Sequence, residues 1–244
     1  MKPQQVSGRA GVVHAVFTNK RGGVSTGRFA SLNLGDHVGD DPAAVAKNRE
    51  LLQQEVGAPP IIWMDQVHSA TVRVVDANTP VPVRETDAIV TNRKGVAVAV
   101  LVADCVPVLL ADPHVGIVAA VHAGRQGARN GIVPAALKAM EKLGARIDQV
   151  VAFLGPAASG SKYEVPADMA ADVESHLPGC AATTQWGTTG VDVRAGLHRQ
   201  LLFAGVASVD VSEACTITDT EYFSYRRENV TGRQAGLMWI SEKE

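Results

Sequence analysis

Short apolar runs alternate with longer amphipathic segments along this chain, and the two kinds of segment predict different elements. The short runs are rich in valine, which favours strands. The strands predicted in this way cover residues 11–18, 61–64, 71–76, 87–91, 96–103, 106–111, 116–121, 150–155, 181–184 and 208–211. The amphipathic segments predict helices from Asp40-Asp41-Pro42 to about Val56 and over residues 127–143, 166–176 and 193–204. Pro134 indicates that the regular part of the second helix starts near that residue.

Three consecutive runs, residues 96–103, 106–111 and 116–121, consist almost entirely of Val, Ala, Leu and Ile. Strands of this composition are usually buried on both faces, so we expect these three to form the central sheet. Strands mixed with helices throughout predict an α/β or α+β fold. No repeat, low-complexity segment or linker divides the chain, and we expect a single compact domain over residues 1–244.

Composition narrows the classes of function. With 46% hydrophobic residues in 244 and a formal net charge of -2, the chain can bury a large core and has no strong charge of either sign. A broad nucleic-acid surface would need clustered basic residues, so nucleic acid is not an expected partner. No apolar stretch approaches the roughly 18 residues that span a bilayer, and the opening Met1-Lys2-Pro3-Gln4-Gln5 leads into no apolar signal core. We therefore expect no membrane association.

The cysteines indicate the compartment. Cys105, Cys180 and Cys215 are odd in number and far apart in the sequence, which suits reduced thiols better than a disulfide framework. We expect a cytoplasmic protein. The sequence leaves the oligomeric state open between a monomer and a weak dimer.

Three potential metal ligands lie beside the predicted strands. Cys105 follows the run 96–103, His122 follows the run 116–121, and His68 lies between two shorter strands. Two imidazoles and one thiolate leave a fourth tetrahedral position free, which is typical of a catalytic rather than a structural zinc. The alternative is that Cys105 is a buried small hydrophobe, as cysteines in apolar runs usually are. Asp104 favours the first interpretation because a carboxylate beside an apolar run needs a partner or a purpose.

Two polar loops carry residues suited to anions and aromatic bases. The segment 19–25 places Lys20 and Arg21 beside two glycines and a serine, and the segment 223–233 combines three arginines with two aromatic residues. A solvated turn or an exposed hairpin tip would have the same composition. His37, in a further polar loop, is taken as a solvated side chain.

A set of motifs occurs in the order that is seen in one known family. The motifs are Arg21-Gly22-Gly23-Val24-Ser25, Ser31-Leu32-Asn33-Leu34-Gly35, Gln66-Val67-His68, Thr86-Asp87-Ala88, Ala103-Asp104-Cys105-Val106-Pro107, His122-Ala123-Gly124, Gly155-Pro156, Tyr163-Glu164-Val165 and Phe223-Ser224-Tyr225-Arg226-Arg227. Through them the chain resembles, from about Val13 to Trp239, the YfiH family, also called the multicopper polyphenol oxidase or laccase-domain family. Members of that family are now regarded as purine nucleoside phosphorylases.

The resemblance implies a mixed-sheet α-β-β-α sandwich and a zinc site made by His68, Cys105 and His122, with copper as the other possible metal. It implies phosphorolysis of adenosine, inosine and methylthioadenosine, with adenosine deamination as a side activity. The partners would be purine nucleosides and phosphate. The chain departs from the family pattern in two places. Arg125-Gln126 stands where many members have Trp-Arg, which leaves the preferred substrate open. Ala157 and Ser161 stand where members often have cysteines, so those thiols cannot be required here.

Roles for the remaining residues follow as hypotheses. His68, Cys105 and His122 would be catalytic as zinc ligands, and a bound zinc activates water, as deamination requires. Asp104 would orient a ligand histidine through a hydrogen bond. Substrate or phosphate would be held by Arg21, Asn33, Tyr225 and Arg226.

Three other functions stay open at this point. A copper oxidase acting on phenols would need more histidines than this chain has, and no His-X-His pair occurs. A cysteine hydrolase, for example an amidase editing cell-wall precursors, would use Cys105 as nucleophile and His122 as base without a metal. A binding protein with a structural zinc is disfavoured by the open fourth position.

Overall fold

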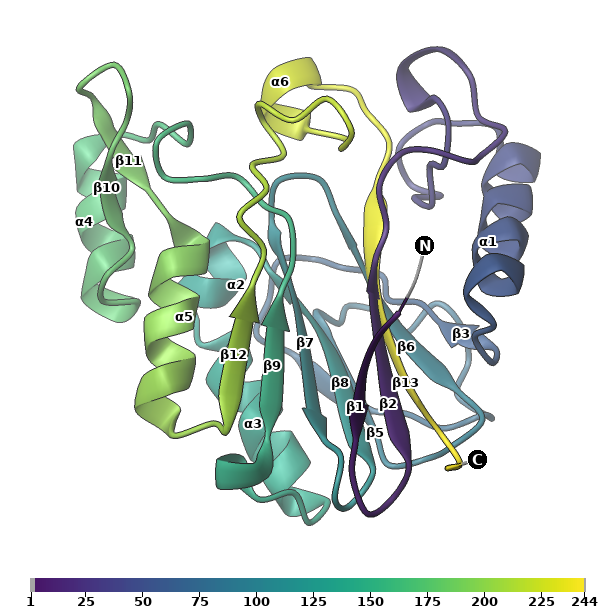
Figure 1. The fold of residues 1–244 in the computed structure, drawn as a ribbon. Helices are drawn as coiled ribbons and strands as arrows, with labels where there is room; N and C mark the ends of the chain where they lie inside the picture. Colours follow the sequence, from purple (N-terminus) through teal and green to yellow (C-terminus); the bar gives the residue numbers. More distant parts are fainter. Residues whose placement is uncertain (1–2, 244) are drawn as a thin grey trace.

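Two β-sheets packed face to face, with helices on both outer sides, make up the protein (Figure 1). The structure is a computed structural model that describes residues 3–243. Met1, Lys2 and Glu244, at the ends of the expected domain, lie outside the described residues. The mixed α/β class and the α-β-β-α layers are those expected from the sequence and the resemblance. Among the described residues, no helix is long and apolar enough to cross a membrane.

The first sheet has five strands. In spatial order they are β1 (Gln4–Ser7), β2 (Val12–Phe17), β13 (Gln234–Ser241), β6 (Ala97–Val102) and β3 (Ile61–Ile62). Neighbouring strands are antiparallel except β3, which runs parallel to β6. Helix α1 (Pro42–Val56) lies on the outer side of this sheet (Figure 1).

The second sheet has six strands. In spatial order they are β12 (Ser208–Val211), β9 (Val151–Leu154), β7 (Val106–Asp112), β8 (Ile117–Ala123), β5 (Ala88–Thr91) and β4 (Val72–Val74). The two outermost pairs, β12 with β9 and β4 with β5, are parallel, and the inner pairs are antiparallel.

Helices cover the outer face of the second sheet. They are α2 (Arg125–Arg129), α3 (Ile132–Lys142), α4 (Ala167–His176) and α5 (Val193–Ala204). A small hairpin of β10 (Ala181–Thr183) and β11 (Thr189–Val191) stands beside α4, and the short α6 (Tyr225–Glu228) lies above the strand ends (Figure 1). Two single 3-10 turns span Gly27–Phe29 and Ile147–Gln149.

Strand β6 shows why a continuous apolar run suits this fold. Ala97, Ala99 and Leu101 pack toward α1, whereas Val98, Val100 and Val102 pack into the layer between the sheets. Because successive side chains of a strand point to opposite faces, both sets are buried only when each face of the sheet is covered. The second sheet, with helices on its outer face, follows the same rule.

The three runs expected to form one central sheet are divided between the two sheets. Strand β6 belongs to the five-stranded sheet, and β7 and β8 are the central pair of the six-stranded sheet. A strand in either sheet is buried on both faces, so composition could not show whether the three runs belong to one sheet or to two. The consequence is functional, because the link Ala103-Asp104-Cys105 crosses from one sheet to the other.

Helix ends were predicted well where the capping residues are strong. The Asp41 side chain accepts a hydrogen bond from the Ala43 amide, Pro42 occupies the first turn of α1, and Gly57 ends it with φ of 66°. The expected helix 127–143 is instead two helices, broken at Gly131 with φ of 81°, and Pro134 lies in the first turn of α3.

Strands β1, β11 and β13 were not predicted from the sequence. Strand β13 is the central strand of its sheet, paired with β2 on one side and β6 on the other. Its Gln234 and Gly236 interrupt the apolar pattern. Gly236 lies against the Phe17 ring, where a Cβ atom would be 3.0 Å from the ring, so the glycine reflects a close approach rather than a loop.

Candidate metal centre and active site

Strand register brings the predicted ligands to one edge of the second sheet. Pro107 of β7 lies opposite His122 of β8, which places Cys105 beside the end of β8. Ala88 of β5 pairs with Val121, and Val72 of β4 pairs with Ala88, so the loop that precedes β4 reaches the same edge. This loop carries His68.

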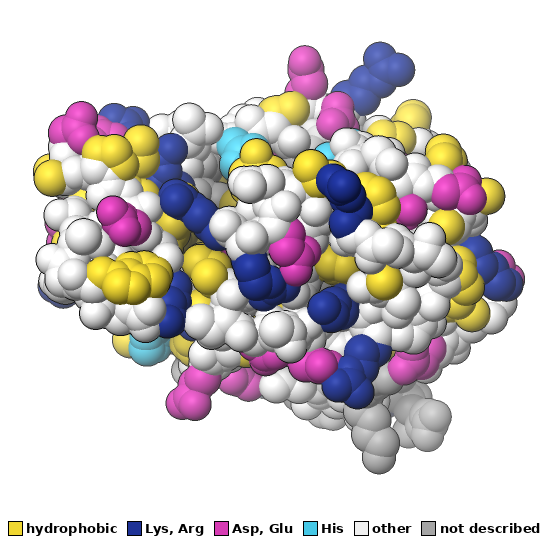
Figure 2. All heavy atoms as spheres, turned by 90° about the horizontal axis from the view of Figure 1, so that it is seen from above, with side chains coloured by type: hydrophobic (Ala, Val, Ile, Leu, Met, Phe, Trp, Pro, Cys, Tyr) yellow, Lys and Arg dark blue, Asp and Glu magenta, His cyan; other side chains and the backbone are white. Residues whose placement is uncertain are grey.

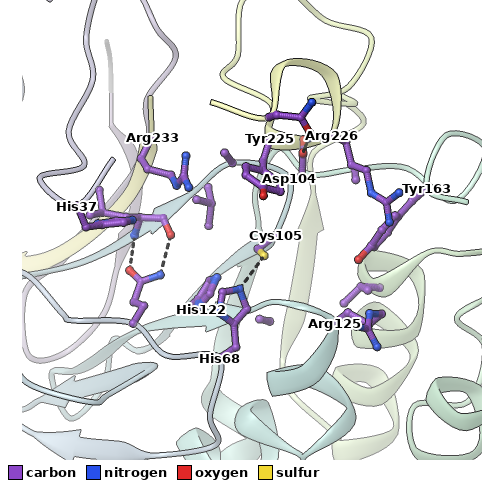
Figure 3. Close-up of a pocket in the computed structure, with 18 residues that line it drawn as sticks. His37, His68, Asp104, Cys105, His122, Arg125, Tyr163, Tyr225, Arg226 and Arg233 are labelled. Carbon is purple, nitrogen blue, oxygen red and sulfur yellow. Dashed lines mark hydrogen bonds between the residues drawn. The ribbon is translucent and has the colours of Figure 1, made fainter. Parts of the chain in front are cut away.

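The three ligand atoms form one cluster. Those of His68, Cys105 and His122 all lie within 4.8 Å of one another, and Cys105 Sγ is 3.9 Å from His68 Nε2 (Figure 3). Bonds of about 2.0–2.3 Å in a tetrahedral zinc site separate ligand atoms by about 3.5 Å, so small movements would close this cluster on an ion. His122 is buried, Cys105 is half-buried and His68 is exposed, which leaves one side of the cluster accessible.

A buried carboxylate, Asp87, holds two of these ligands. Its Oδ1 accepts hydrogen bonds from His122 Nδ1 at 2.8 Å and from the His68 amide at 2.9 Å. Its Oδ2 accepts from the amide and hydroxyl of Ser69, both at 2.7 Å. The bond to Nδ1 leaves Nε2 of His122 as the atom for a metal, the arrangement usual around ligand histidines.

Asp87, Cys105 and His122 stabilise one another's charged forms. Burial opposes ionisation of the Asp87 carboxyl, but His122 and Ser69 outweigh it and lower its pKa to about 2. Burial likewise opposes ionisation of Cys105, but His122 and His68 outweigh it and lower the pKa of the thiol to about 6. The pKa of His122 is raised to about 9, because Cys105 and Asp87 outweigh the cost of burying the cation. In metal-free protein near pH 7, Cys105 is therefore mostly a thiolate and His122 mostly an imidazolium.

Backbone geometry at the cluster is unusual. His68 and Asp104 have φ of 61° and 83°, in the left-handed region that costs non-glycine residues about 1–3 kcal/mol. Gly124 passes so close that a Cβ atom there would lie 2.8 Å from His68 Cδ2 and 3.0 Å from Cys105 Sγ. A side chain at position 124 would occupy the space between the ligands.

Asp104 has a different partner from the one expected. Its Oδ1 accepts from the Thr216 hydroxyl and its Oδ2 accepts from the Arg226 amide, each at 2.6 Å. In Figure 3 the Asp104 side chain points upward, away from the metal ligands. Its carboxylate therefore connects the link between the two sheets to α6. The orienting contact to a ligand histidine is made by Asp87.

A pocket of about 640 Å³ opens over the cluster, a size typical of small-molecule sites. Tyr225 and Arg226 line it together with the three ligands and Asp104. Figure 2 looks down on the end of the molecule where the loops gather and shows Lys and Arg side chains over its central part, mixed with acidic ones.

Arg21 and Asn33 do not line this pocket. The Arg21 side chain is 73% exposed and forms an ion pair with Glu221. Asn33 is buried, and its side chain bonds to Gly35, Asp40 and the Arg233 amide. Asn33 therefore supports Arg233, which does line the pocket.

The sequence predicted no role for Asp87 or for the lining residues His37, Gln66 and Tyr163, and Arg233 entered only as one of the three arginines of the segment 223–233. Asp87 had the signal that singled out Asp104, a carboxylate beside an apolar run, and it lies in a family motif. Gln66 and Tyr163 also lie in family motifs, but the loops that carry these lining residues come together only in the folded chain.

Fold and site together define an α-β-β-α sandwich with an accessible His/Cys/His cluster at one sheet edge. A family described as multi-copper polyphenol oxidoreductase laccase matches residues 14–241. The crystal structure of the Neisseria meningitidis protein NMB0706 superposes with a TM-score of 0.87 at 36% identity, covering 98% of this chain and 99% of that one. YlmD from Geobacillus stearothermophilus gives the same TM-score at 30% identity and the same coverage. The chain belongs to this family, which is the YfiH family.

Curated relatives add names. A Corynebacterium glutamicum protein named purine nucleoside phosphorylase is 55% identical over 95% of this chain and 96% of its own length. A Mycobacterium tuberculosis protein with the same name is 51% identical over 93% and 92%. These names, together with the cluster, support an enzyme of that kind.

Proposed function

We propose that this protein is a metal-dependent purine nucleoside phosphorylase acting on adenosine, inosine and methylthioadenosine. The observation that carries the proposal is the His68/Cys105/His122 cluster, which lines a pocket of about 640 Å³, within the usual range of small-molecule sites. The names of the Corynebacterium and Mycobacterium relatives support the reaction class. The expected cytoplasmic location belongs to this proposal, and the three free cysteines are consistent with it.

The reaction sets requirements that the pocket residues meet. In phosphorolysis the bond from C1′ to N9 breaks, phosphate forms a new bond to C1′, and the purine leaves with the electron pair and takes up a proton. Positive charge develops on the ribose, and the pocket offers the Asp104 carboxylate as a nearby negative group. Arg226 offers a cation for phosphate, and Tyr225 a ring for the substrate.

Zinc suits the donor set best. His68 and His122 would hold it through nitrogen and Cys105 through sulfur, and two nitrogens with one thiolate are common zinc ligands. Copper shares these preferences and stays the other possible metal. When bound, the ion supplies Lewis acidity to the reaction. We include adenosine deamination, in which water replaces the C6 amino group and ammonia leaves, as a side activity.

A cysteine hydrolase is the second candidate, and one observation favours it. The Cys105 thiolate and the His122 imidazolium stabilise each other, as in enzymes whose nucleophile is a thiolate. Such an enzyme would work without a metal. A multicopper oxidase, which the family description suggests, needs several copper ions, and the described residues contain one His/Cys/Asp/Glu group with ligand spacing.

Product analysis separates these functions. Purified protein of known metal content is incubated with each of the three nucleosides, with and without phosphate, and the products are separated by chromatography. The proposal predicts free base and a pentose 1-phosphate only when phosphate is present, and their loss in Cys105→Ala. Amide hydrolysis by metal-free protein, with no nucleoside cleavage, would favour the cysteine hydrolase instead.

A further inference from the structure

The two ends of the pocket differ in charge. Arg125, Tyr163 and Arg226 lie on one side of the cluster, and His37 and Arg233 lie on the other (Figure 3). Gln66 is bonded to Leu101, which pairs with Ala235 of β13, two residues after Arg233. A phosphorolytic pocket must hold a dianion and a nucleoside at once, so this difference bears on which end takes which group.

Arg226 has a guanidinium that is free to bind an anion. It lies over the Tyr163 ring, with Cζ 4.6 Å from the ring centroid. The contact orients the guanidinium without neutralising it, because the ring carries no charge. Within residues 3–243, Arg226 makes its hydrogen bond through the backbone amide to Asp104, and the guanidinium has no acidic partner.

Arg125 brings a second cation to the same end. It follows Gly124 at the start of α2, is half-buried and lines the pocket. Asp172 is close enough to interact electrostatically with Arg125, but both of its carboxylate oxygens are already bonded to Arg129 at 2.7 Å. The donors of Arg125 thus stay available to a ligand, since no hydrogen bond engages them among the described residues.

At the opposite end the cation has a fixed anionic neighbour. Arg233 lies near the Asp104 carboxylate, whose negative charge offsets its own. Its Nη1 donates to the carbonyls of Thr231 and Gly232, both at 3.0 Å. Both amide atoms of Gln66 are bonded to the backbone of Leu101. This end of the pocket therefore provides hydrogen-bonding side chains for an uncharged group rather than a concentration of positive charge.

We infer that Arg125 and Arg226, with Tyr163 positioning the second, form a subsite for a phosphoryl dianion, and that the nucleoside base lies toward His37 and Gln66. Two guanidiniums facing one space match the oxygens of a tetrahedral dianion. This inference rests on the proposed function. The dianion is either free orthophosphate or the phosphoryl group of a nucleoside 5′-phosphate.

The test combines binding with kinetics on the full-length, metal-loaded protein. Binding of orthophosphate is measured by calorimetry, and the KM values for phosphate and inosine are measured separately, for wild type, Arg125→Gln, Arg226→Gln and Arg146→Gln. Arg146 is the control, because it is an exposed arginine that pairs with Asp148 and does not line the pocket. Inosine 5′-phosphate is tested as a competitor of orthophosphate and of inosine.

We expect Arg125→Gln and Arg226→Gln each to weaken orthophosphate binding and raise the KM for phosphate by at least about ten-fold, as loss of a charge-assisted hydrogen bond implies. The KM for inosine should change less than about two-fold in both variants, and Arg146→Gln should leave orthophosphate binding and both KM values within about two-fold of wild type. Competition by inosine 5′-phosphate against inosine, lost in both variants, would support the subsite with a substrate-borne phosphoryl group as its ligand.

The subsite is refuted if phosphate affinity is unchanged in both variants while cleavage still depends on phosphate; the proposed function would then stand alone. If wild type shows no phosphate-dependent cleavage but orthophosphate binding still requires Arg125 and Arg226, the function fails and the subsite is retained.

Discussion

One oxygen of Asp87 lies 2.8 Å from His122 Nδ1 and 2.9 Å from the His68 amide, so a single carboxylate fixes two of the three candidate metal ligands. The two histidines come from different strands and loops, and Asp87 is the group that both contact. Its position follows from the register, because β5 pairs with β8 directly after it.

We predict that Asp87→Ala lowers metal affinity by about 10–100-fold, the usual effect of removing the partner of a ligand histidine. Titration against a chelator of known affinity measures this. Asp112→Ala is the control, since Asp112 is equally buried but bonds to His114, Val115 and Arg146 away from the ligand cluster. Equal metal affinity in the two variants would show that Asp87 is only a structural carboxylate.

Acid stability should depend on Asp87. Its pKa is lowered in the folded protein from 3.8 to about 2, so the ionised carboxylate stabilises the fold above about pH 4 and this contribution disappears as pH falls through about 2. The contribution is on the order of 2 kcal/mol. In metal-free protein, the free energy of unfolding measured in urea should therefore fall more steeply between pH 5 and pH 2 for wild type than for Asp87→Asn. Parallel curves would contradict the prediction.

Gly124→Ala should disrupt the cluster without unfolding the protein. The new methyl group would meet His68 Cδ2 at 2.8 Å and Cys105 Sγ at 3.0 Å, and His68 is on an exposed loop that can move away. We expect metal binding to fall by at least about ten-fold while the melting temperature of the metal-free protein changes little. Gln126→Ala, at an exposed position nearby, serves as the control. Full metal occupancy in Gly124→Ala would show that Gly124 does not pass as close to His68 and Cys105 as described.

The Cys105 thiol should be reactive at neutral pH in metal-free protein. With a pKa of about 6 it is mostly thiolate at pH 7, whereas the pKa of Cys180, which is fully buried, is raised to about 12 by burial and Glu174. Iodoacetamide labelling followed by peptide mass spectrometry should give a midpoint near pH 6 for Cys105 and no labelling of Cys180. His122→Ala should raise the midpoint, and bound zinc should protect the thiol. A wild-type midpoint near pH 9 would contradict the charge pairing.

Sequence patterns predicted the local elements better than their arrangement. Helix α1 was found because Asp40, Asp41 and Pro42 are strong signals of a helix start, and the runs at β6, β7 and β8 were found because both faces are buried. The division of those runs between two sheets was not predictable from composition. It depends on pairing with β13, whose pattern is broken by a glycine that contacts Phe17.

The candidate site shows the same limit. The ligand triad was predicted from residue chemistry, and the structure brings its members together. The carboxylate partner of His122 was not predicted correctly, because Asp87 and Asp104 both lie beside apolar runs in the sequence. Only the strand register and the conformation of the link 103–105 make Asp87 the residue that contacts His122. Arg21, the cation singled out from a glycine-rich loop, lies outside the pocket, whereas Arg233 lines it.

X-ray absorption at the metal edge of the purified protein tests the His68/Cys105/His122 metal centre, because it reports the atoms bound to the ion. We predict one ion per chain with two nitrogen ligands at about 2.0 Å and one sulfur ligand at about 2.3 Å. In Cys105→Ala the sulfur shell should disappear. A metal shell without sulfur in wild type, or a sulfur shell that persists in Cys105→Ala, would show that His68, Cys105 and His122 are not the metal centre.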